Sequence, residues 1–335
     1  MEEQFPSIPM ERTSKIFRRS IFTFLQKYQY FTTTSLLLAL PFSASILMSQ
    51  ALLPFFPLLP TIHNRLRSLF YAAEFPPSQF FSILSLNLSQ TIASSIFALP
   101  FTLSFLLMAK ATIIQALNHH YHNKPSSLSS FLSIYNPILL TQLCNSLVIL
   151  SANATCFSLF FIAFNTLEGS GYYSSTSLHL LSATGAIVYS IVLANTLIIC
   201  NLASVSSGMD KCGGYLALLK ACLLIRGRTG TALALAVPVN IALSAVEALF
   251  QYRVVRAFYG AKSSFSSMAI EGFLIAYLYS IIVVIDTIVS CVFFKSCQKA
   301  CRIDQGGRCD YRIEIERRDF DRLNAAKVKN LEEFP

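Results

Sequence analysis

Residues 210–240, DKCGGYLALLKACLLIRGRTGTALALAVPVN, decide the fold that the sequence predicts. One helical face of the first half carries Tyr215, Leu218, Leu219 and Cys222. Lys220 lies on another face, and Arg226 and Arg228 follow it, which is the pattern of a helix in the membrane interface. The second half is an apolar run broken by Pro238 and suits the hydrocarbon core. We therefore expect an interfacial helix followed by a membrane span.

The composition of the whole chain favours a membrane protein. Its 335 residues are 54% hydrophobic and 13% charged, whereas a soluble domain is about 25% charged. The net charge of +9 comes from residues that flank apolar runs, where they set orientation, so we expect no nucleic-acid partner. The nine cysteines lie mostly inside apolar runs, which indicates buried thiols rather than disulfides.

The apolar runs divide the chain into three parts. We expect a disordered N-terminus over 1–11, a membrane domain over 12–294 and a charged cytosolic tail over 295–335. The six expected spans cover about 31–59, 83–108, 137–164, 178–203, 231–250 and 273–294. The prediction is an all-α polytopic protein with three hairpins of transmembrane helices, each preceded by an amphipathic interfacial helix.

The lysines and arginines predict the orientation. The segments assigned to one side of the membrane hold 21 of the 26 basic residues. Because positive charge stays on the cytosolic side, both termini are expected in the cytosol, in an endomembrane or the plasma membrane. The interfacial helices then predict contact between the protein and anionic headgroups of the lipid bilayer on that face.

Two segments of the chain resemble each other. Residues 32–41, TTTSLLLALP, and 229–238, TGTALALAVP, agree at six of ten positions, and each follows a basic amphipathic segment. An internal repeat and a chance likeness between apolar spans both explain the agreement. The shared preceding context favours the repeat.

Three motifs carry a family resemblance. They are YHNKP at 121–125, before the third expected span, and SVS at 204–206 with LIRGR at 224–228, before the fifth. Over roughly 12–300 the chain resembles a plant family of multi-pass transmembrane proteins of unknown function. The layout is loosely similar to the membrane domain fused to some bacterial glycerophosphodiester phosphodiesterases, without their catalytic domain. The resemblance implies an architecture and no functional residues.

Four polar residues inside the spans form a candidate intramembrane layer. Counted along ideal helices, Asn145, Asn195 and Asn240 lie about 10–14 Å from the cytosolic side, and Asp286 about 12 Å. Transporters place such layers at their substrate or ion sites, and a buried ionisable group is costly elsewhere. The alternative is that the asparagines hold helices together.

Further polar side chains allow more specific interpretations. Glu247 lies near the far end of the fifth span, where we expect it to pair with Arg253 or Arg256. Cys297 and Cys301 lie one helical turn apart after the sixth span and are candidates for reversible palmitoylation. Zinc binding is the alternative for these cysteines, but the spacing fits no standard ribbon. The histidine cluster at 119–122 lies in a polar loop and is expected to face water.

The sequence contains no recognisable catalytic signature. It has no P-loop, nucleophile elbow, HExxH or dinucleotide fingerprint. We therefore expect no catalytic residue, cofactor or metal. The leading interpretation is a non-enzymatic membrane protein that organises the bilayer or recruits partners. The alternative is a transporter or channel that uses the polar layer around Asp286.

Overall fold

The computed structural model describes residues 13–52, 55, 57–72, 79–119, 128–169, 175–260 and 265–304. These residues form helices and contain no strand. Six of the helical stretches are long and apolar enough to cross a membrane, so the all-α class and the predicted number of spans are confirmed. By length and composition the chain is a multi-pass membrane protein. Residues 1–12 and the tail from 305 lie outside the described part.

The N-terminal half consists of α1 (Thr13–Gln26), α2 (Tyr28–Thr34), η1 (Ser35–Ala39), α3 (Leu40–Leu52), α4 (Leu58–Ala72), α5 (Gln79–Phe101), η3 (Thr102–Leu106) and α6 (Leu107–His119). The C-terminal half consists of α7 (Leu128–Gly169), α8 (Ser175–Asp210), α9 (Tyr215–Ile225), α10 (Thr229–Phe250), η4 (Gln251–Val255), α11 (Arg256–Gly260) and α12 (Phe265–Asp304). The segments η1, η3 and η4 are π-helical.

The spans differ in extent from those predicted. They cover Tyr28–Ser49, Leu88–Asn118, Phe131–Leu167, Leu180–Asp210, Thr229–Phe258 and Ser266–Ala300. The second span was predicted to end at residue 108 but continues through Lys110, because one charge does not interrupt the hydrogen bonds of a helix backbone. At about 1.5 Å per residue, the 42 residues of α7 extend well beyond a hydrocarbon core of about 30 Å.

Two of the π-helical segments lie beside prolines. Pro41 cannot donate a hydrogen bond to the carbonyl of Leu37 in η1, and Pro100 lies two residues before η3. The wider turn of a π-helix accommodates the loss of this hydrogen bond. Residues 32–41 therefore pass through α2, η1 and α3, whereas 229–238 remain α-helical in α10. The internal repeat stays a prediction.

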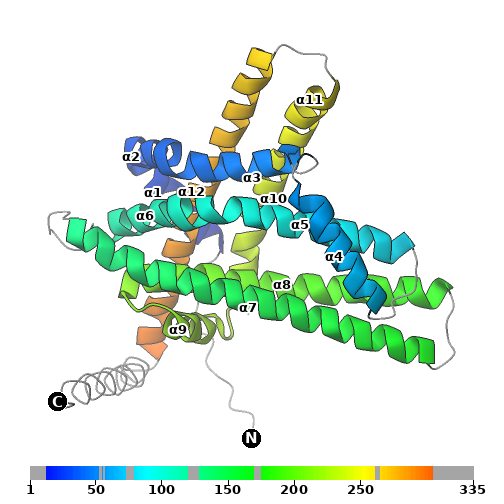
Figure 1. Cartoon of the computed structure of the whole chain (residues 1–335). Helices are drawn as coiled ribbons and strands as arrows, with labels where there is room; N and C mark the ends of the chain where they lie inside the picture. The colour runs from blue at the N-terminus through cyan, green and yellow to red at the C-terminus, as the bar shows by residue number, and fades with distance from the viewer. Residues whose placement is uncertain are drawn as a thin grey trace, which may run out of the picture.

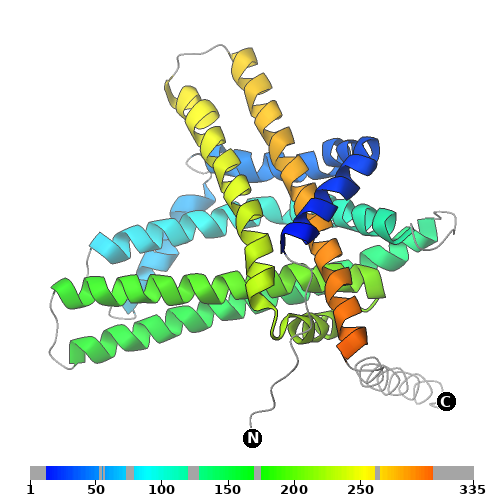
Figure 2. The same cartoon turned by 180° about the vertical axis from the view of Figure 1, so that it is seen from behind.

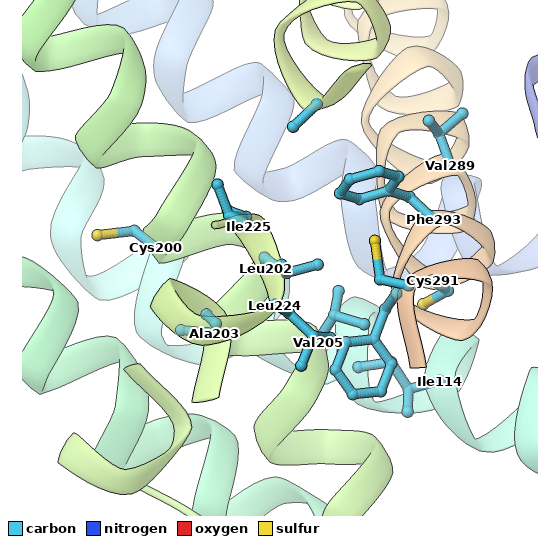
Figure 3. Close-up of a cluster of buried hydrophobic side chains, with 14 of the residues drawn as sticks. Ile114, Cys200, Leu202, Ala203, Val205, Leu224, Ile225, Val289, Cys291 and Phe293 are labelled. Carbon is cyan, nitrogen blue, oxygen red and sulfur yellow. The ribbon is translucent and has the colours of Figure 1, made fainter. Parts of the chain in front are cut away.

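The long helices run in two main directions. In both views α7 and α8 lie side by side, and α3, α5 and α6 follow a similar direction, whereas α10 and α12 cross them (Figure 1, Figure 2). Helix α12 packs against α1, α3, α6, α8, α9 and α10. The largest cluster of buried apolar side chains surrounds it, with contributions from α6, α8 and α9 (Figure 3). Helix α12 is therefore the central element of the fold.

Helix α9 packs differently from its prediction. Its buried side chains are Ala217, Leu218, Ala221, Leu224 and Ile225. Of the four residues on the predicted apolar face, Tyr215, Leu219 and Cys222 are exposed. Both sides of α9 are apolar, so helical periodicity could not identify the side that packs. Lys220 forms an ion pair with Asp210 of α8, with 3.0 Å between Nζ and Oδ2.

Candidate site between helices six, eight and twelve

A polar network joins α6, α8 and α12 in the interior of the spans. Lys110 Nζ donates a hydrogen bond to Asn201 Oδ1 at 3.3 Å. Asn201 Nδ2 donates to Asp286 Oδ2 at 3.1 Å and to Ser290 Oγ at 3.0 Å. The amide thus turns its oxygen toward the cation and its NH2 toward the anion. We call these four residues the Lys110–Asp286 network.

Asn201 lies between Lys110 and Asp286 and hydrogen-bonds to both, whereas the two charged groups form no direct ion pair. Within the described part of the chain, the ion pairs are Lys220 with Asp210 and Arg253 with Glu271, and neither belongs to the network. Lys110 and Asp286 are both half-buried among apolar helices. Removing such groups from water costs several kcal/mol each, which attraction and hydrogen bonding must offset. Asn201 therefore connects the charges of α6 and α12 electrostatically.

A small cavity adjoins the network between α8, α10 and α12. Its volume is about 40 Å³, which admits two or three water molecules. The polar groups of its wall are Asn201, Asp286 and Ser290. The apolar residues of the wall are Ile198, Leu202, Ala232, Leu235, Ala236, Val289 and Phe293. Figure 3 shows Phe293 extending from α12 toward the helices that carry Leu202 and Ile225.

Asn145 lies in a second polar contact, away from the network. Its Nδ2 donates to the carbonyl of Cys200 at 2.9 Å and to Ser204 Oγ at 3.0 Å. The side chain is only 2% exposed, and its Oδ1 has no partner among the described residues. Asn145 therefore ties α7 to α8, in the way expected of an asparagine that holds helices together.

The other two asparagines of the predicted layer face outward. Asn195 donates to the carbonyl of Ile191 and Asn240 to that of Ala236, each at 3.0 Å and each within its own helix. Of the four predicted residues, the structure places only Asp286 in the network. Counting along a helix predicts the depth of a residue but not the direction in which its side chain points.

Sequence reasoning did not select Lys110 and Asn201. Lys110 lies just beyond the predicted second span, 83–108, and Asn201 lies inside the predicted fourth span, 178–203, without any role assigned to it. The signal for Lys110 was the run ATIIQAL after it, which continues the apolar helix past the charge. No comparable signal exists for Asn201, because its partners come from helices distant in sequence.

Glu247 has a different partner from the one predicted. Tyr279 Oη donates to Glu247 Oε1 at 3.1 Å, which links α12 to α10. Arg253 instead pairs with Glu271 at 3.5 Å, and Arg256 lies over the ring of Tyr252. The predicted pairing of Glu247 with an arginine is therefore wrong. The neighbouring α12 supplies a closer donor than the π-helical turn that carries Arg253.

The candidate lipidation site lies partly in the core. Cys297 is 1% exposed and belongs to the largest buried cluster, and Arg228 Nη1 donates to its carbonyl at 3.0 Å. An acyltransferase cannot reach a thiol in this position. The side chains of Cys301 and of residues 119–122 lie outside the described part, and the described residues contain no group of three metal-ligating side chains.

The burial of Cys297 predicts its reactivity. In single-cysteine variants purified in mild detergent, Cys222, which is exposed on α9, should react with a maleimide at least about ten times faster than Cys297. Denaturation in SDS should abolish the difference, because both thiols are then accessible. Equal rates in the folded protein would contradict the placement of Cys297 in the core.

Comparison with known proteins identifies one match. A family model described as "Domain of unknown function (DUF8558)" matches residues 3–333. No curated protein and no solved structure matches the chain. The resemblances to a plant family and to bacterial membrane domains stay predictions.

Proposed function

The chain belongs to the family of unknown function DUF8558, and we propose that this member conducts protons across a membrane through the cavity beside Asp286. The observation that supports the proposal is a carboxylate, an amide and a hydroxyl on the wall of one cavity within the spans. Ionisable groups inside membrane spans are rare because they are costly, and they commonly mark ion or proton pathways.

The size and chemistry of the cavity favour a proton over a larger solute. A volume of about 40 Å³ excludes metabolites but holds a short chain of waters. Metal cations prefer oxygen ligands, whereas Asn201 presents its NH2 to both Asp286 and Ser290. Asp286 is then the group that accepts the proton and releases it to water in the cavity.

Some neighbours of Asp286 stabilise its charged form, and others stabilise its neutral form. The Asn201 N–H and the nearby Lys110 favour the carboxylate, and the apolar wall of the cavity favours the neutral acid. Protonation of Asp286 removes its negative charge, and with it the attraction between Asp286 and Lys110 that Asn201 transmits. Proton binding is thereby coupled to the contacts that hold α6, α8 and α12 together.

Proton flux into vesicles tests the proposal. The test uses vesicles that contain the full chain, valinomycin, an enclosed pH-sensitive dye and more potassium inside than outside. Their interior should acidify faster than that of vesicles without protein. The variant with both Lys110→Gln and Asp286→Asn should lose this flux, because no titratable group remains in the network. The matched control is Glu271→Gln, which removes a carboxylate that is 41% exposed, and it should retain the flux. Wild-type flux no greater than that of empty vesicles would contradict proton conduction.

Helix α4 favours a second candidate, a non-enzymatic role in organising the bilayer or recruiting partners. None of its described side chains is buried, Arg65 and Arg67 are exposed, and Leu69 and Tyr71 are 65% and 87% exposed. A helix with basic and apolar side chains free of the core suits the membrane interface. The same vesicles distinguish the candidates, since clustering or reshaping without proton flux supports the second. For both candidates we keep the predicted cytosolic termini and the three-hairpin arrangement as proposals.

A further inference from the structure

Four basic residues gather where α1, α2, α6 and α12 meet. Arg19 lies on α1, Lys27 between α1 and α2, and Lys295 and Lys299 on α12. Arg19, Lys27 and Lys299 are close enough to Lys295 for their charges to repel it. We call these residues the basic cluster. Bringing four cations together is unfavourable unless negative charge compensates them.

The basic cluster is built around the end of α6. Lys27 Nζ donates to the carbonyl of Ala116 at 3.1 Å, and Lys295 Nζ donates to that of Leu117 at 3.0 Å. These carbonyls belong to the last turn of the helix, which carries partial negative charge. The carbonyls place the two ammonium groups on neighbouring residues but use one of three N–H donors on each. Within the part of the chain that the structure describes, the other donors have no hydrogen-bond acceptor and are open to a ligand.

The described part of the chain supplies no acid to the basic cluster. Its two ion pairs lie elsewhere, at Lys220 with Asp210 and at Arg253 with Glu271. Arg19 and Lys299 are exposed, whereas Lys27 and Lys295 are half-buried. Two cations of the cluster, Lys27 and Lys295, are therefore held by the carbonyls of α6, and the other two, Arg19 and Lys299, are accessible from outside. An anion that reaches it would meet positive charge from α1, from α12 and from Lys27 between α1 and α2.

Three span ends place the basic cluster at a membrane interface. Lys27 directly precedes the span Tyr28–Ser49, Leu117 lies one residue before the end of Leu88–Asn118, and Lys299 lies one residue before the end of Ser266–Ala300. Lipid phosphates lie at this level of a bilayer, immediately outside the hydrocarbon. We infer that the basic cluster binds the negatively charged headgroup of an anionic phospholipid. This inference is independent of proton conduction through the cavity.

Titration with short-chain lipids tests the inference on the full chain in detergent. Dioctanoyl phosphatidylserine is the probe, phosphatidylcholine of the same chain length is the neutral comparison, and inorganic phosphate is the free anion. The informative variant combines Arg19→Gln with Lys299→Gln, since both side chains are exposed and neither donates a hydrogen bond to the described residues. At roughly fivefold per charge, this variant should bind phosphatidylserine about 25-fold more weakly.

A matched control separates the basic cluster from net charge. The variant with Arg253→Gln and Arg256→Gln also loses two exposed cations, from η4 and α11, and should bind phosphatidylserine as the wild type does. Replacing Lys27 and Lys295 with glutamine should weaken binding further, provided that thermal unfolding shows an intact fold.

Several results would overturn the inference. They are equal affinity for phosphatidylserine and phosphatidylcholine, an equal loss in the Arg253 and Arg256 control, and inorganic phosphate binding as tightly as the lipid.

Discussion

Replacing Asp286 with asparagine should lower the free energy of unfolding by about 3 kcal/mol or more. The change leaves the Lys110 ammonium inside the spans without the carboxylate that balances it through Asn201. Breaking a buried charge pair by removing one partner is strongly destabilising, because the remaining charge keeps its desolvation cost. SDS titration of the purified protein, followed by circular dichroism, measures the loss.

A second substitution should restore most of this stability. Combining Asp286→Asn with Lys110→Gln removes both charges, and the two amides can still hydrogen-bond to Asn201. The double-mutant cycle should therefore give a coupling energy of about 2 kcal/mol or more. The exposed pair of Arg253 and Glu271 is the control, and Glu271→Gln should cost less than about 1 kcal/mol. A double variant no more stable than Asp286→Asn alone would show that the charges do not act together.

Replacing Gly213 with alanine should cost about 3 kcal/mol, because the turn between α8 and α9 touches α7. A Cβ at this position would lie 2.8 Å from Cα of Pro137 and 3.0 Å from its carbonyl oxygen. Both atoms belong to the backbone of α7, so relief requires a shift of the helix rather than of a side chain. The shift would also weaken the bond from the Gly214 N–H to Thr141 Oγ1, now 2.9 Å long.

Gly230 provides the matched control for Gly213. It lies at the start of α10, and a Cβ there would meet nothing within 4 Å. Gly230→Ala should therefore leave stability unchanged or raise it by up to about 1 kcal/mol, through higher helix propensity. Thermal unfolding in detergent compares the two variants. Similar midpoints for Gly213→Ala and the wild type would contradict the close packing of the turn against α7.

The local features of the chain were largely predictable. Residues 210–240 were correctly predicted to form a short helix before a long apolar one. Gly214 has a φ of +73°, which glycine adopts without strain. These features depend on near neighbours in the chain, and local sequence therefore contains most of the information needed.

The candidate site was predictable only in part. Asp286 was selected from its charge within an apolar run, and this needs no knowledge of other helices. Its partners Asn201 and Lys110 precede it by 85 and 176 positions, and neither spacing leaves a pattern in the sequence. Asn195 and Asn240 were included by depth alone, and their side chains point away from the network.

The sequence by itself determined that this is an all-α membrane protein with six apolar helices, because hydrophobicity and length are properties of each segment. Only the tertiary structure decided which faces meet. It placed α9 against the core, buried Cys297 and joined Lys110 to Asp286 through Asn201. The physical reason is that apolar helices offer several faces of similar hydrophobicity, and packing with distant helices selects among them.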